Sequence, residues 1–241
     1  MNDYYVYPEI IDAKIPSLAV SIELLGLKNE ELFENFINSE IELCVSKYSS
    51  VSIKEMDAIV GYDELHRQYG KRSKKIKSAP ETLIRGILKK GSMPRINYLV
   101  DIYNIISIKY AIALGAHDLD KIKGNMVLKF ITGEEVFQPI GATELEPIFS
   151  GEYGYIDDVT NELLCRLEAR QSNTSKLSET STKILQIIQD NRKTTKEYLY
   201  DAKNEMLNNI NKFYEFVVIR EYNCADDKVK ITEATDNTTH N

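Results

Sequence analysis

The stretch GSMPRINYLVDIYNIISIKYAIALGAHDLDK, residues 91–121, decides the fold of this chain. Its first half is the most apolar helix candidate, 97–113, and the polar residues Asn97, Asp101 and Asn104 recur on one face of that helix. Its second half, GAHDLDK (115–121), stands where helical patterns give way to short strand-like runs. This arrangement predicts a core helix whose polar stripe faces water, holds the adjoining loop or meets a ligand.

The patterns on either side predict helices before this stretch and strands after it. The expected elements are a strand over 15–24, helices over 29–47, 53–69 and 79–90, strands over 126–131, 135–140, 152–156, 163–170 and 184–188, and a helix over 194–214. This order is typical of an α+β domain with helices on one side of a mixed or mainly antiparallel sheet. We expect one domain over residues 1–222 and a polar, disordered tail over 223–241.

Length and composition exclude several classes of protein. The 241 residues are 43% hydrophobic and 28% charged, as in ordinary globular domains. No apolar run is long enough to cross a membrane, and Asp3, Glu9 and Asp12 argue against a signal peptide. The three cysteines form no close pair, so neither a disulfide framework nor a CxxC zinc site is expected. We therefore expect a cytoplasmic protein without a membrane partner, a metal or a cofactor.

Positive charge is concentrated between His66 and Arg95, although the whole chain has a formal net charge of −7. Glu81 is the only acid in this segment. Such an asymmetry can orient as well as attract a polyanion. The residues that we expect to contact RNA phosphates are Lys71, Arg72, Lys74, Lys75 and Arg95. The alternative is a solvated, lysine-rich loop.

Common catalytic motifs are absent from the sequence, because it contains no glycine-rich phosphate loop, no HExxH and no GxSxG. Within GAHDLDK, His117, Asp118 and Asp120 could form an acid–base set or part of a hard-cation site. Neighbouring residues of a strand point to opposite faces, and aspartates also form turns, so a structural role stays open.

A second polar cluster is CRLEARQS, residues 165–172. On a continuous strand, Arg166, Glu168 and Arg170 would share one face, which would meet either solvent or a polar cavity.

Four motifs, in order, resemble the free-standing B3/B4 domain proteins, which are relatives of the editing and tRNA-binding B3/B4 module of the phenylalanyl-tRNA synthetase beta subunit. The motifs are the succession over 91–141 that ends in ITGEEVFQPIG, GEYGYIDD (151–158), CRLEARQS (165–172) and TSTKI (180–184). The resemblance covers residues 15–212. It implies a three-layer sandwich of mixed and antiparallel strands with helices outside, tRNA or another structured RNA as partner rather than DNA, and no aminoacylation core.

Matched to the family pattern, the resemblance implies a pocket formed by the helix stripe, the GAHDLDK loop and the strand end at RQS. Its catalytic candidates are His117, Asp118 and Asp120. Its other candidates are Asn97, Asp101, Asn104, Lys121, Glu134, Arg170, Gln171 and Ser172. The chain departs from the synthetase pattern at Gly115, where the editing histidine of the synthetase would fall, and over 184–189, where no acid stands.

The resemblance implies an RNA- or tRNA-binding protein that hydrolyses mischarged aminoacyl-tRNA in trans. An aminoacyl ester is already activated, so hydrolysis needs a positioned water and donors for the developing oxyanion more than a strong nucleophile. If the protein is an enzyme, we expect a deacylase and not a ligase. The alternatives are an RNA-binding module without catalysis and a protein that binds a free amino acid. All three readings need a chamber between the apolar helix, GAHDLDK and RQS.

Overall fold

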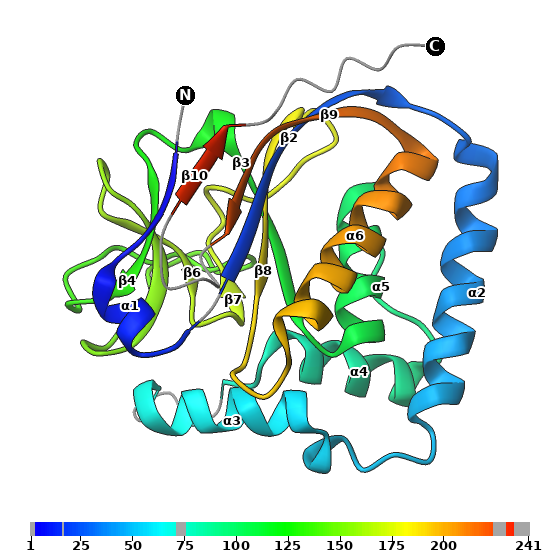
Figure 1. The fold of residues 1–241 in the computed structure, drawn as a ribbon, viewed down its shortest axis with the longest axis horizontal. Coiled ribbons are helices and arrows are strands. Elements are labelled where there is room, and N and C mark those ends of the chain that lie inside the picture. The colour runs from blue at the N-terminus through cyan, green and yellow to red at the C-terminus, as the bar shows by residue number, and fades with distance from the viewer. Residues whose placement is uncertain (1–2, 16, 71–75, 224–229, 234–241) are drawn as a thin grey trace.

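The computed structural model describes residues 3–15, 17–70, 76–223 and 230–233 (Figure 1). In chain order the elements are β1 (Tyr4–Val6), α1 (Pro8–Asp12), β2 (Ser17–Leu27), α2 (Glu30–Tyr48), η1 (Ile53–Glu55), α3 (Asp57–Tyr69), α4 (Ala79–Lys90), α5 (Tyr98–Tyr110), β3 (Ala113–Asp118), η2 (Leu119–Lys121), β4 (Met126–Phe130), β5 (Tyr153–Asp157), β6 (Glu162–Arg166), β7 (Arg170–Gln171), β8 (Lys183–Gln189), α6 (Lys196–Phe213), β9 (Tyr214–Asn223) and β10 (Lys230–Glu233).

The strands form two sheets. One has the strand order β1-β4-β5-β6-β7 and the other has the order β10-β9-β2-β8-β3. All pairs between the strands are antiparallel except β1 with β4. Figure 1 shows the two sheets side by side, with α2, α5 and α6 beyond the second sheet and α3 across one end. The expected α+β architecture of three layers is confirmed.

The strands β2 and β8 in the middle of the second sheet are largely buried on both faces, and their residues alternate between two cores. In β2, Leu18 and Val20 pack against the helices, whereas Ala19 between them faces the first sheet. In β8, Ile188 packs against the helices, and Leu185 packs between the sheets. A strand that is covered on both faces usually has a nearly continuous run of apolar residues, and this explains why most residues of KILQIIQ are apolar.

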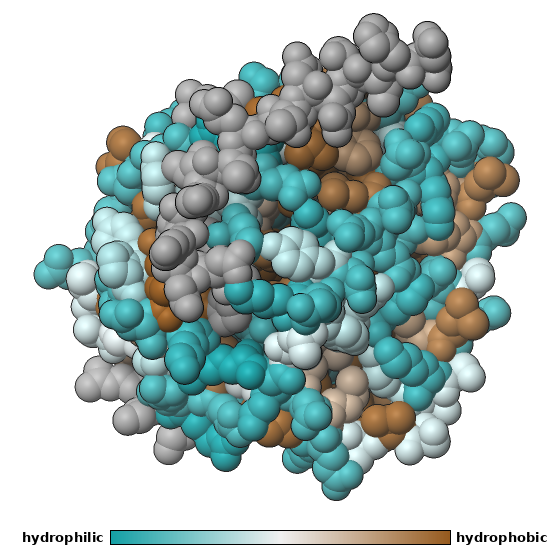
Figure 2. Space-filling model, in the orientation of Figure 1, coloured by the Kyte–Doolittle hydropathy of each residue, from teal (hydrophilic) through white to brown (hydrophobic). Residues whose placement is uncertain are grey.

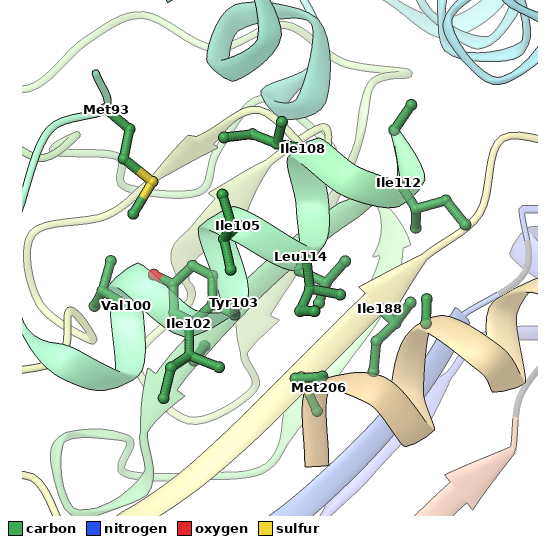
Figure 3. Packing of buried hydrophobic residues seen from close by; sticks show 14 of the residues in the cluster. Met93, Val100, Ile102, Tyr103, Ile105, Ile108, Ile112, Leu114, Ile188 and Met206 are labelled. Carbon is green, nitrogen blue, oxygen red and sulfur yellow. The ribbon is translucent and has the colours of Figure 1, made fainter. Parts of the chain in front are cut away.

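The apolar helix α5 lies in the centre of the helical core. Figure 3 shows side chains of α5 and β3 gathered with Ile188 of β8 and Met206 of α6. The helix ends at Tyr110, earlier than the expected end at residue 113, because Ala111 adopts a left-handed conformation with φ 52°. The Ser107 hydroxyl donates to the carbonyl of Ile112 beyond this end. The chain then reverses directly into β3, which the sequence patterns do not predict.

Three further expectations were wrong in detail. Residues 53–69 form η1 and α3 rather than one helix. Residues 135–140 form no strand but only two isolated bridges, Val136 with Glu162 and Pro139 with Ser172. The expected strand over 163–170 breaks after Arg166, because Leu167 has a positive φ of 51°. Arg166, Glu168 and Arg170 therefore do not share one strand face.

The structure also contains elements that the patterns do not predict, namely β1, α1 and β9. Strand β10 lies within the segment expected to be a tail and pairs with β9 in antiparallel register. Apart from β10, residues 224–241 lie outside the described residues, and the division into residues 1–222 and 223–241 stays a prediction. In the described part of the chain, no helix is both long and apolar enough to cross a membrane.

Candidate functional site

A cavity of about 150 Å³ lies where the predicted chamber was expected. It is bounded by α4, α5, β3, β5, β6, β8, β7 and the turn before β7, and its lining includes His117 from GAHDLDK and Gln171 from RQS. The complete lining is Ala79, Tyr103, Asn104, Ala113, Leu114, Gly115, His117, Tyr155, Cys165, Glu168, Ala169, Gln171, Ile187 and Gln189. The structure therefore brings the two motifs together around one space.

His117 lies on β3 with its side chain toward the first sheet, and it is buried. Its Nδ1 atom lies 2.7 Å from the Ser175 hydroxyl and 3.4 Å from Nε2 of Gln171. Because an amide nitrogen can only donate, Nδ1 is an acceptor and the ring proton is on Nε2. Burial lowers the pKa of His117 to about 3. The ring is therefore neutral at physiological pH and acts as a hydrogen-bonding group rather than as a proton store.

Glu168 is a second buried polar group of the cavity, and the turn at Leu167 places it there. Its Oε1 atom lies 2.6 Å from Nε2 of His66, and its Oε2 atom accepts a hydrogen bond from the Tyr153 hydroxyl. The other ring nitrogen of His66 lies 3.2 Å from the carbonyl oxygen of Ile76. Two acceptors on one ring favour the doubly protonated form. Burial opposes that charge, but the Glu168 carboxylate outweighs it and raises the pKa of His66.

The strand β8 contributes an amide to the cavity. Gln189 is 1% exposed, and its Oε1 atom accepts a hydrogen bond of 2.5 Å from the Tyr155 hydroxyl. Its Nε2 atom has no hydrogen-bond partner within the described residues. A buried donor without a partner is costly, so a ligand oxygen at this position would be favoured. The signal in the sequence is the glutamine at the end of the largely apolar strand KILQIIQ.

Comparison with known proteins identifies the family. A family model described as "B3/4 domain" matches residues 62–205, which include the second part of α3, the whole of α4 and α5, all the strands around the cavity and half of α6. The chain belongs to the B3/4 domain family. The resemblance inferred from the motifs is thereby confirmed.

Among solved structures, this B3/4 domain is similar to an N-terminal fragment of the phenylalanyl-tRNA synthetase beta-subunit from Pyrococcus horikoshii. The sequence identity is 14%, the TM-score is 0.47, and the match covers 89% of this chain and 50% of that chain. The chain therefore spans about half the length of that fragment. No curated protein sequence matches this chain.

The predicted acid–base set of the B3/4 domain is not assembled as one set. Asp118 follows His117 on β3 and points to the opposite face, where it accepts hydrogen bonds from the Ser181 hydroxyl and the Asp120 amide. Lys121 pairs with Asp118 at 3.2 Å and donates to the carbonyl oxygen of Lys176. Asp120 is exposed, 3.7 Å from Nζ of Lys183. These three residues hold η2 and the following loop, and none of them lines the cavity.

The polar stripe of α5 is divided between two places. Asn104 lines the cavity. Asn97 caps α5 by accepting a hydrogen bond from the Val100 amide. Asp101 is buried, and it accepts hydrogen bonds from the Ile96 amide and from Nε of Arg95. Two of the three residues therefore hold the loop before α5, which is one of the roles that the sequence left open.

Arg95, a predicted RNA contact, is occupied by carboxylates. Its guanidinium group donates to both carboxylate oxygens of Glu34, at 2.8 Å each, in addition to Asp101. It lies in a larger depression of about 670 Å³, which Leu25 and Leu27 also line. Figure 2 shows apolar side chains gathered near the upper ends of β2 and β9, and the bounds of β2 include both leucines. A paired arginine beside apolar side chains is a poor phosphate contact.

Two of the remaining pocket candidates, Arg170 and Ser172, bind carboxylates near the cavity. Arg170 binds the Glu146 carboxylate through both terminal nitrogens. The Ser172 hydroxyl donates to Glu162 at 2.7 Å. Glu134 is exposed on its loop; the buried residue next to it, Glu135, accepts the amide hydrogens of Thr132 and Gly133. Of these candidates, Gln171 alone lines the cavity.

Four predicted RNA contacts, Lys71, Arg72, Lys74 and Lys75, lie outside the described residues. The described residues on either side of them are placed close to the cavity. Gly70 lies against the side chain of Leu167, and the carbonyl of Ile76 contacts His66, the partner of Glu168. Ala79, at the start of α4, lines the cavity itself. The described residues that flank the basic segment (residues 71–75) thus lie near the wall that carries Glu168.

The described residues contain no group of three or more His, Cys, Asp or Glu side chains that is arranged to hold a metal ion.

Proposed function

We propose that this B3/4 domain protein binds aminoacyl-tRNA, with the aminoacyl end in the cavity and the phosphates near the basic segment (71–75), and that it hydrolyses the aminoacyl ester in trans. The observation that carries the proposal is that Ile76, which follows this segment in the chain, is connected to the cavity wall through the Ile76–His66–Glu168 contacts. A partner with a polyanionic body and a small end without negative charge would suit both the basic segment and the cavity. We infer an RNA partner rather than DNA and a cytoplasmic location.

The cavity has the size for one small side chain. About 150 Å³ is enough for a group such as a benzene ring, whereas a nucleotide would have to stay outside. This volume matches the aminoacyl end of a tRNA better than its terminal base. The RNA body would then lie against the surface near α3 and α4, where the basic segment begins and ends.

Hydrolysis in this cavity would depend on positioned hydrogen bonds. The neutral His117 ring can donate from Nε2, and the Gln189 amide has an unused donor. Donors of this kind stabilise the oxyanion that forms when water attacks an ester carbonyl. With a pKa of about 3, His117 is a weak base, so the water must be activated mainly by its position and by the reactivity of the ester.

The experiment that tests the proposal is a deacylation assay on a panel of tRNAs, each charged with a different amino acid. We expect release of the amino acid from at least one of them. His117→Ala should lower that rate by about 10²-fold or more, as loss of an oxyanion donor does. Glu144→Gln, at an exposed position that does not line the cavity, is the matched control.

Two other results would change the conclusion. Binding of tRNA without turnover of any substrate would favour the RNA-binding module without catalysis, a reading that the separation of Asp118 and Asp120 from the cavity also favours. Neither binding nor turnover would overturn the proposal.

A further inference from the structure

The cavity offers no positive side chain to a ligand. Within the described part of the chain, its lining contains neither Lys nor Arg, and its one carboxylate is that of Glu168. His66, a residue of α3, binds Glu168 and compensates part of that charge, but it does not line the cavity. The side of Glu168 that faces the cavity therefore favours a cation or a hydrogen-bond donor over an anion.

The other ionisable groups of the lining stay neutral. Burial keeps the pKa of His117 at about 3, so the ring supplies no positive charge at physiological pH. Burial, with a further contribution from the Glu168 carboxylate, raises the pKa of the Cys165 thiol to about 12. Both shifts have the same physical cause, a dry space in which an uncompensated charge is unfavourable.

The start of α4 does not supply a compensating positive end. Ala79 lines the cavity, but the first turn of this helix is already capped by the Ser78 hydroxyl, which accepts from the Glu81 amide. Glu81 also brings a carboxylate into that turn, where Lys77 and Arg85 bind it. A capped first turn with its own carboxylate attracts a further anion weakly.

We propose that the cavity accepts an aminoacyl group only when its α-carboxyl group is esterified or amidated, and that Glu168 determines this specificity by repelling a free carboxylate and facing the α-ammonium group. This inference rests on the proposed function and deepens it. A free amino acid would have to bury a carboxylate without a counter-charge, beside another carboxylate. An ester carries only the ammonium charge, which Glu168 can accept.

The same arrangement would promote release of the product. In hydrolysis the water oxygen joins the acyl carbon and the bond from that carbon to the ribose oxygen breaks. The ribose oxygen takes one proton, and a second proton leaves to solvent as the carboxylate forms. The uncharged ester group thus becomes a carboxylate beside Glu168. The cavity would bind the substrate better than the amino acid that it produces.

The test compares pairs of small probes that share a side chain. The free acid, the primary amide and the N-acetyl amide of each proteinogenic amino acid are titrated into the full-length protein at concentrations up to about 10 mM, and binding is followed by NMR. Shifts of the His117 ring signals locate binding in the cavity. We expect at least one amide to bind, with its free acid at least tenfold weaker and its N-acetyl amide also weaker.

Glu168→Gln should bring the acid and the amide within about threefold of each other, whereas Glu144→Gln should leave their ratio unchanged. The comparison in the unmodified protein decides the matter even if Glu168→Gln does not fold. A free acid that binds as tightly as its amide, or the failure of every amide to bind, would overturn the inference. Binding of tRNA is measured separately, so loss of the proposed function and loss of this specificity give different results.

Discussion

The Nε2 atom of His66 lies 2.6 Å from Oε1 of Glu168, although the two residues are 102 positions apart. His66 lies in the last turn of α3, and Glu168 lies in the turn between β6 and β7. Their contact joins the segment before α4 to the wall of the cavity, because the other nitrogen of His66 contacts Ile76. The pair therefore connects Ile76, in the chain before α4, to the cavity wall.

We expect His66→Ala to lower the free energy of unfolding by about 3 kcal/mol, because it leaves the Glu168 carboxylate buried without its cationic partner. Chemical denaturation measures this change. In the double variant with Glu168→Gln, the combined loss should be smaller than the sum of the two single losses. Additive losses would show that the pair does not act as a unit.

The same pair predicts a pH dependence. The folded state raises the pKa of His66 above the ordinary value of 6.5. The contribution of the His66–Glu168 pair to the free energy of unfolding is therefore fully present below pH 6.5. It is lost as the pH rises through the pKa that His66 has in the folded state. The difference in unfolding free energy between the unmodified protein and His66→Ala should thus shrink on the alkaline side. A difference that grows with pH would contradict the assignment.

His117 predicts the opposite behaviour. Its pKa falls from 6.5 to about 3 on folding, so below pH 6.5 the unfolded chain binds a proton that the folded protein does not. Between about pH 6.5 and 3, the mismatch at His117 should therefore lower the free energy of unfolding by about 1.4 kcal/mol for each unit of acidification. His117→Gln should remove this dependence. In NMR titrations its ring signals should not move between pH 8 and 5, and a midpoint near 6.5 would show that the ring is solvated.

The basic segment is tested by a matched pair of charge changes. Lys74→Gln with Lys75→Gln should weaken tRNA binding and reduce the slope of log affinity against log salt by about 0.7 to 0.9 for each phosphate that the protein no longer neutralises. The control is Lys54→Gln with Lys196→Gln, which removes the same charge from exposed positions elsewhere. Equal effects of the two double variants would mean that net charge, and not this segment, governs binding.

Two helical glycines give a direct test of packing. A Cβ atom at Gly61 of α3 would lie 2.3 Å from the carbonyl oxygen of Asn191, whereas one at Gly86 of α4 would have no heavy atom within 4 Å. Gly61→Ala should therefore lower the unfolding free energy by about 1–3 kcal/mol. Gly86→Ala should raise it by about 0.4–1 kcal/mol, because alanine favours a helix. Thermal unfolding of both variants compares the same change in two environments.

Periodicity predicted the elements that bury a large apolar face. The helices α2, α4, α5 and α6 and the strands β2, β4, β5 and β8 lie within a few residues of their expected bounds. It missed β9, whose residues are mostly half-buried and exposed, and β3, which follows α5 without a turn signal. Neither strand shows the regular alternation of buried and exposed residues that indicates a half-buried strand: β3 is buried along almost its whole length, and β9 has a single buried residue.

The candidate site was predictable in part. His117, Asn104 and Gln171 were named from the sequence and line one cavity. Asp118 and Asp120 were named with them but hold a loop instead, because aspartates near a turn serve as hydrogen-bond acceptors as readily as they serve chemistry. Glu168 was expected on a strand face, and the positive φ of Leu167 turns it into the cavity wall.

By itself the sequence determined the α+β class, the central apolar helix, the family and the place of the basic segment, because burial patterns and ordered motifs are local properties of the chain. Only the tertiary structure decided which polar groups meet. The cavity draws residues from helices and from both sheets, and the Glu168–His66 contact joins segments far apart in the chain. Contacts between residues that are distant in the chain depend on how the layers pack, and a local sequence pattern does not predict them.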